Sequence, residues 1–180
     1  MLNRGREIDP LVRIQYSPLI IIIKEHEMKQ FMTLHGVKIE NLIEYIKDYM
    51  STRENVDILI GSDSQSYSNS KTVYGVVIAL YQKGKGCHVL CSREKTPMEH
   101  NMSKRLLTEV WKSVELAEYL KENGLPKPSS IDIDLNPDPK YKSNSALRQA
   151  IGMVEGMGYK VRYKHNGAMM TYAANHLVRI

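Results

Sequence analysis

The sequence predicts an α/β domain built on a mixed five-stranded sheet with helices on both faces. Three strand-like runs in succession, at 56–65, 73–82 and 87–92, indicate an antiparallel meander. Two further strand-like runs, at 131–138 and 159–165, alternate with helical patterns, which calls for a mixed sheet with helices on its faces. The predicted order from residue 56 is strand, strand, strand, helix, strand, helix, strand, helix.

The chain of 180 residues fits one domain and can bury a core without disulfides or a structural metal. We divide it into an N-terminal extension at 1–37 and a domain at 38–180. Within the extension only 19–22 has the character of a strand, and the segment could be an arm, a strand added to the sheet or a partner site. The domain opens with an amphipathic helix predicted at 38–50.

The remaining helices have recognisable ends. The sequence KGKG at 83–86 is predicted to be a hairpin turn between two strands. A long helix over 101–123 is closed by Gly124 and Pro126. Ser143 is predicted to cap the next helix, which ends near Gly156 and Gly158. A short terminal helix is predicted within the Ala-rich stretch at 168–180.

Composition narrows the class of protein only loosely. A net charge of +5 permits a polyanionic partner such as nucleic acid, although such an excess is common in other proteins. Cys87 and Cys91 lie too far apart on a strand for a mutual disulfide, which favours a reducing compartment. The longest aliphatic run is Leu19 to Ile23, so no membrane span is predicted. With no secretory signal apparent, we expect a cytoplasmic protein.

Two carboxylates fall at positions where the pattern predicts burial. On a helical wheel of 101–123, Glu109 shares the arc of Met102, Leu106, Val110, Val114, Leu116, Ala117 and Leu120. Asp63 follows an apolar strand that is expected to lie in mid-sheet. A buried carboxylate requires a cation or a metal as its partner. The alternatives are a salt-bridged helix acid for Glu109 and a turn residue for Asp63.

A third candidate acid lies on the strand IDIDLNPD at 131–138, where Asp132 and Asp134 share one face. The alternative is that Asp132 or Asp134 is an ordinary exposed residue. If the first and fourth strands are neighbours, Asp63 and Asp134 converge and the intervening helix brings Glu109 over them. Converging carboxylates favour a divalent cation, and hard oxygen ligands select Mg²⁺ or Mn²⁺. Such a cluster is suited to two-metal hydrolysis of phosphodiester bonds.

The order of elements and acids resembles the ribonuclease H-like fold. More narrowly, the stretches IGSDSQ, GKG, DIDLNPD, KSN, GMVEGMGY and the final AAN are similar to the YkuK-like family of ribonuclease H-like proteins of bacteria and phages. The likeness covers about 38–180. It implies a metal site of Asp63, Glu109 and Asp134, with a fourth ligand at Asn175, where the family has Asp. Because Asn brings no charge, the second metal is expected to bind less tightly.

The resemblance implies a nuclease that acts on nucleic acid through Mg²⁺ or Mn²⁺. The alternative is a non-catalytic nucleic-acid-binding or assembly protein that keeps the fold after losing an acid. Whether the substrate is DNA, RNA, a hybrid or a junction stays open. Two weaker predictions are that His165 and His176 assist the reaction or are surface residues, and that Lys160, Arg162 and Lys164 meet phosphates or solvent. Asp132 is expected to support the site from the same face as Asp134 rather than to act as a primary ligand.

Overall fold

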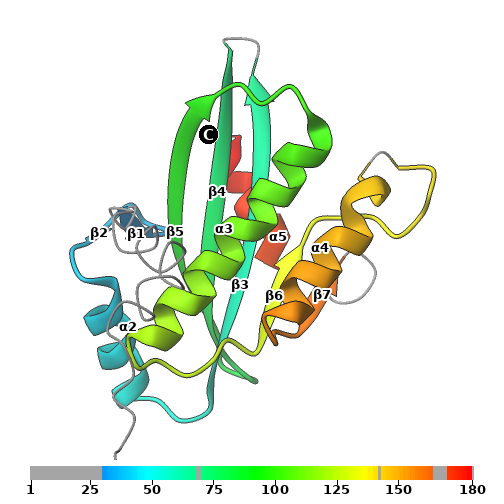
Figure 1. The fold of residues 1–180 in the computed structure, drawn as a ribbon. Coiled ribbons are helices and arrows are strands. Elements are labelled where there is room, and N and C mark those ends of the chain that lie inside the picture. Colours follow the sequence, from blue (N-terminus) through cyan, green and yellow to red (C-terminus); the bar gives the residue numbers. More distant parts are fainter. Residues whose placement is uncertain (1–29, 68–69, 142, 164–169, 180) are drawn as a thin grey trace, which may run out of the picture.

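The computed structural model describes residues 30–67, 70–141, 143–163 and 170–179, and it contains one seven-stranded sheet (Figure 1). Across the sheet the strand order is β2-β1-β5-β4-β3-β6-β7. The strands are β1 (Phe31–Thr33), β2 (Lys38–Ile39), β3 (Val56–Tyr67), β4 (Lys71–Gln82), β5 (Gly86–Pro97), β6 (Ser130–Ile133) and β7 (Val161–Tyr163). The helices are α2 (Leu42–Ser51), α3 (Met102–Glu122), α4 (Asn144–Gly156) and α5 (Met170–Val178). The predicted α/β class with a mixed sheet is confirmed.

The five predicted strands correspond to β3 to β7, and two short strands are additional. β1 pairs with β5 and β2 pairs with β1, both antiparallel. β1 lies inside the segment that the sequence left unassigned, so part of that segment is a strand added to the sheet. The strand predicted at 19–22 lies outside the described residues.

A meander and two parallel strands make up the main sheet. β3, β4 and β5 pair antiparallel along their full lengths, as the sequence predicts. Gly84 and Gly86, with φ of 76° and 104°, supply the left-handed backbone that the β4–β5 turn requires. β6 then pairs parallel to β3, and β7 parallel to β6. The first and fourth predicted strands are therefore neighbours.

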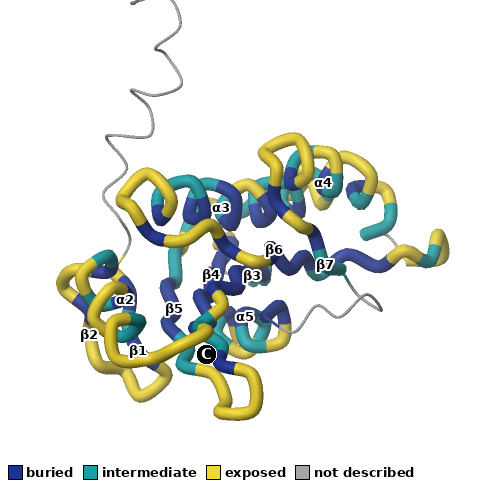
Figure 2. Tube along the Cα trace, turned by 90° about the horizontal axis from the view of Figure 1, so that it is seen from below, coloured by how far each residue is buried: buried dark blue, intermediate teal, exposed yellow. Residues whose placement is uncertain are grey.

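The helices cover both faces of the sheet (Figure 2). On one face, α2, α3 and α4 contribute to the larger buried apolar cluster, which includes Ile46, Val110 and Val154. On the other face, α5 closes a smaller cluster through Met170 and Ala174. No helix among the described residues has the length and apolar character of a membrane span.

The leading helix starts later than the sequence pattern predicts. Residues 38–39 are strand β2, and α2 begins at Leu42. The Asn41 side chain accepts a hydrogen bond from the Glu44 N–H at 3.1 Å, which is the geometry of a helix N-cap. Ile39, counted as part of the helical stripe, instead packs into the core from β2.

The strand predicted over 131–138 stops at Ile133, which is also the last of its residues to pair with the described part of β7. Beyond it, the Asn136 side chain accepts the Asp138 N–H at 3.0 Å and stabilises a turn. Ser143 occupies the N-cap position of α4, as predicted, but its side chain makes no capping bond to the helix. Its hydroxyl instead accepts the Asn136 N–H at 3.3 Å.

An opening in the sheet follows from the unequal lengths of β3 and β6. β3 pairs with β4 as far as Tyr67, whereas its pairing with β6 runs only from Leu59 to Gly61. In the described part of the chain, the β6-side edge of β3 therefore has no strand neighbour from Ser62 onward. This edge lies beside the point where the chain leaves β6.

Candidate metal centre

Asp63 lies on β3 just beyond the last β6 partner, directly opposite Gly75 of β4. Its side chain is buried, with 7% of the residue exposed. The carboxylate accepts the Ser64 N–H at 2.7 Å and a hydrogen bond from the Asn175 side chain. The strand therefore holds Asp63 at the opening of the sheet on the face covered by α5.

Glu109 reaches the same region from the other face. It is 1% exposed, as the helical wheel predicts, and its Oε2 accepts the Ser64 hydroxyl at 2.7 Å. α3 is fixed against β3 by a chain of hydroxyls, in which Ser113 donates to Ser62 and Ser62 donates to the Glu109 main-chain oxygen. Met102, expected on the buried arc, is 39% exposed because it is the first residue of the helix.

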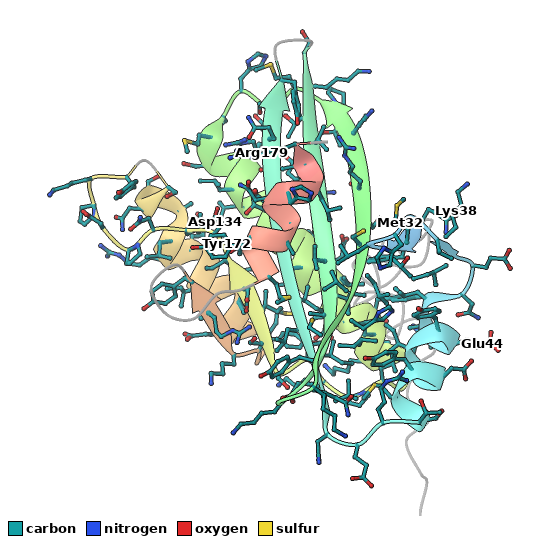
Figure 3. The ribbon with its side chains drawn as sticks, turned by 180° about the vertical axis from the view of Figure 1, so that it is seen from behind. Met32, Lys38, Glu44, Asp134, Tyr172 and Arg179 are labelled. Carbon is teal, nitrogen blue, oxygen red and sulfur yellow. The ribbon has the colours of Figure 1, made fainter. Side chains whose placement is uncertain are left out.

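Asp134 follows β6 directly and is half-buried. Its charge acts on both Asp63 and Glu109. Figure 3 marks Asp134 in the view of the face that α5 covers, together with Tyr172 on that helix. The structure thus brings the three predicted acids within electrostatic reach of one another.

Asn175 reaches the cluster from α5 and is itself half-buried. The next residue, His176, is exposed. His165 and Lys164 lie outside the described residues. The structure therefore brings together the four predicted side chains. Asp63 comes from β3, Glu109 from α3 and Asn175 from α5, and Asp134 directly follows β6.

The pKa values of the two buried acids reflect their burial first and the neighbouring negative charge second. Burial raises the pKa of Asp63 from 3.8 to about 6, and the Asp134 charge adds to this, while the Ser64 N–H, Asn175 and Arg105 oppose it. Burial also raises the pKa of Glu109 well above its usual value, and the Asp63 charge acts in the same direction. Both shifts indicate that the fold holds carboxylates together at an electrostatic cost.

Two residues that support the acids were missed by the sequence analysis. Ser64 contacts both acids, through its N–H to Asp63 and its hydroxyl to Glu109. The Arg105 guanidinium donates to the Ser64 carbonyl at 3.1 Å, and its charge lowers the pKa of both acids. Arg105 was detectable in principle, because it lies four residues before Glu109 and thus on the same side of the helix. Nothing in the local sequence pattern distinguishes Ser64 from its neighbours.

Asp132 has a supporting role that the structure makes specific. It is fully buried and forms a bidentate ion pair with Arg162, at 2.7 Å to Nε and 2.9 Å to Nη2. The same carboxylate accepts the N–H of Met170, the first residue of α5, at 2.9 Å. Arg162 therefore neutralises Asp132, rather than standing open to phosphate, and the pair fixes the start of the helix that carries Asn175.

The chemistry of the donors fits a hard divalent cation, with three carboxylates and an amide oxygen. Ser64 engages one carboxylate oxygen of Asp63 and one of Glu109, so a second oxygen of each of these two acids lies outside its contacts. Among the described residues, however, no three acidic, His or Cys side chains are already spaced to hold a single ion. The donor set therefore fits a hard divalent cation in kind and charge.

Comparison with known families identifies the fold. A family model described as ribonuclease H-like matches residues 39–179. The chain belongs to the ribonuclease H-like family. A search of curated proteins finds no match to the sequence. The narrower likeness to YkuK-like proteins stays a prediction. For this ribonuclease H-like chain, the family points to a function related to nucleic acid.

Proposed function

We propose that the protein is a metal-dependent nuclease that hydrolyses phosphodiester bonds by a two-metal mechanism. The observation that carries the proposal is the burial of Asp63 and Glu109 beside Asp134, with the pKa of both buried acids raised. Such an arrangement destabilises the ionised protein unless a cation is bound. Perturbed carboxylates that share a site are typical of functional centres.

In this proposal Asp63, Glu109, Asp134 and Asn175 hold Mg²⁺ or Mn²⁺. A bound pair of ions would activate water and stabilise the leaving oxygen. The protein's own groups orient the ligands: the Ser64 hydroxyl fixes the Glu109 carboxylate, and the Asn175 amide holds Asp63. Both acids must release their protons before they can coordinate.

The test is a cleavage assay on labelled single-stranded DNA, duplex DNA, RNA, RNA–DNA hybrid and a four-way junction. Each substrate is incubated with Mn²⁺ or with EDTA. We expect cleavage of at least one substrate with Mn²⁺ and loss of that activity in Asp63→Asn. The control is Asp57→Asn, which should retain activity. Asp57 lies on β3 like Asp63, but its carboxylate accepts a hydrogen bond from Ser129. Equal cleavage by Asp63→Asn would contradict the proposal.

A second candidate is a ribonuclease H-like protein that binds nucleic acid or supports an assembly without catalysis. Asn175 favours it, because this residue stands where the resemblance predicts an acid. If the native chain is silent but Asn175→Asp cleaves, the scaffold is a nuclease disabled at its fourth ligand. If neither cleaves while the native chain still binds nucleic acid, the non-catalytic function is correct.

A further inference from the structure

The register of the meander decides which side chains share the face covered by α5. Asp63, Gly75 and Arg93 are direct partners across β3, β4 and β5, so all three project from that face. Alternation then places Lys71 and Lys95 on the same face, near the ends of β4 and β5. Arg179 follows α5 on this side (Figure 3). We call Lys71, Arg93, Lys95 and Arg179 the basic face.

The basic face carries charge of one sign. The other residues that β4 and β5 place on this face are neutral: Val73, Gly75, Val77, Ala79, Tyr81, Cys87, Val89, Cys91 and Pro97. α5 contains no acidic residue. The acid of β5, Glu94, projects from the opposite face and pairs there with Lys112. Cations clustered on one face are the electrostatic footprint of a polyanion site.

Three of the four cations, Lys71, Lys95 and Arg179, are exposed, and no acid among the described residues pairs with any of the four. Arg93 is half-buried, and its buried Nε has no hydrogen-bond partner among the described residues. Arginine guanidinium groups are preferred donors to phosphate oxygens.

The position of the basic face relates it to the candidate metal centre. Two strand spacings separate Asp63 from Arg93, which is about 10 Å. Along one strand of a duplex, this distance corresponds to about three nucleotides. A nucleic acid held with one phosphodiester at Asp63 therefore reaches the basic face only if it extends several nucleotides further.

We propose that the basic face binds the phosphate backbone of the substrate nucleic acid, on the side of α5 away from Asp134. This inference rests on the proposed function for its substrate class. It predicts binding that depends on salt and on the length of the nucleic acid and that does not require metal, since the cations lie outside the metal centre.

The test measures binding by fluorescence anisotropy in EDTA, using labelled 20-nucleotide single-stranded and duplex DNA over a range of salt concentrations. The double variant Lys71→Gln/Lys95→Gln removes two cations of the basic face. The matched control, Lys47→Gln/Lys83→Gln, removes two exposed lysines from α2 and the β4–β5 turn. The slope of log affinity against log salt is negative. The basic-face variant should make it less steep by about 1.4 to 1.8, and the control should leave it unchanged.

Equal slopes for the two variants, or no binding by the native chain at low salt, would overturn the inference. So would equal affinity for poly-glutamate, which would indicate a general anion surface. Because the assay contains no metal, it separates the two proposals. Binding through the basic face without cleavage in Mn²⁺ would refute the nuclease alone, and cleavage with equal slopes would refute the basic face alone.

Discussion

Asn175 is the residue whose side chain has opposite expected effects on the metal-free site and on metal binding. Its amide hydrogen-bonds to Asp63 and lowers the pKa of that acid, which a carboxylate in its place would not do. An amide oxygen coordinates a divalent ion more weakly than a carboxylate because it carries no charge. If Asn175 is a ligand as proposed, the native residue stabilises the metal-free site at the expense of metal affinity.

Asn175→Asp should therefore tighten Mn²⁺ binding by about tenfold, or about 1.4 kcal/mol. The same change should lower the stability of the metal-free protein, because it adds a like charge beside Asp63. Calorimetric titration with Mn²⁺ measures the first effect. Asn123→Asp, at the end of α3, is the control and should leave the affinity unchanged. An unchanged affinity in Asn175→Asp would count against Asn175 as a ligand.

The raised pKa of Asp63 predicts how stability varies with pH in the metal-free protein. Because the pKa of Asp63 is about 6 in the folded state against 3.8 for an unperturbed Asp, the folded protein retains a proton that the unfolded chain releases. The resulting stabilisation is complete below about pH 4 and is lost as pH rises through 6. At neutral pH the ionised group then costs about 3 kcal/mol, chiefly because it is buried, with the Asp134 charge adding to the cost and the Ser64 N–H, Asn175 and Arg105 opposing it.

Asp63→Asn should consequently raise the free energy of unfolding at pH 7.5 by about 1 to 3 kcal/mol and flatten its decline between pH 4 and 6. Urea unfolding in EDTA at several pH values checks both effects. Asp57→Asn, whose carboxylate lies outside the cluster, should leave the profile unchanged. A lower stability of Asp63→Asn at pH 7.5 would show that the ionised carboxylate is not under strain.

At the scale of elements, α5 is placed by close contact with the sheet. A Cβ at Gly61 would lie 2.6 Å from the Met170 Cβ and 2.9 Å from the Met170 carbonyl carbon. A Cβ at Gly75 would lie 2.9 Å from Val178 Cγ1. Together with the Asp132 bond to the Met170 N–H, these glycines set the height of α5 over β3 and β4. The position of Asn175 depends on that height.

Gly61→Ala should destabilise the protein by about 1 to 3 kcal/mol, because the methyl group meets backbone that cannot rotate away. It should also weaken Mn²⁺ binding by displacing Asn175. Gly152→Ala is the control: it lies inside α4 with nothing within 4 Å of the added Cβ, and it should stabilise by about 0.5 to 1 kcal/mol. Thermal unfolding with and without Mn²⁺ measures both. A Gly61→Ala protein as stable as Gly152→Ala would contradict the close approach of α5.

For the whole molecule, the proposed metal centre joins elements from both faces of the sheet. Its proposed ligands come from β3, α3, the end of β6 and α5. One ion could contact all four of these side chains only in the folded protein. Its binding energy therefore adds to the stability of the whole domain.

Mn²⁺ at a hundred times its dissociation constant should raise the free energy of unfolding by about 2.7 kcal/mol. For a domain of this size, the melting temperature should then rise by about 5 to 10 °C. The rise should disappear in Asp63→Asn and in EDTA, and Asp57→Asn should retain it. A similar rise in Asp63→Asn would place the ion elsewhere in the molecule.

The local sequence pattern predicted most of the elements and the burial of two acids, Asp63 and Glu109. Apolar alternation predicts the meander, and the helical period places Glu109 on the inward side of α3, because both depend only on neighbours along the chain. The pattern overextended the strand at 131–138, which ends together with its pairing to β7, a partner 30 residues further on. It also placed 38–39 in a helix, whereas pairing with β1 makes that segment a strand.

The tertiary structure decided what the acids meet. The pairing of β6 beside β3 brings Asp134 toward Asp63, and the unequal lengths of these strands open the sheet there. The Arg162 partner of Asp132, the Ser64 bond to Glu109 and the cations that share the α5 face all join residues distant in sequence. The sequence by itself determined the elements and the candidate acids, because these follow from local periodicity. Only the tertiary structure decided their partners, because strand order and register are set by packing across the whole sheet.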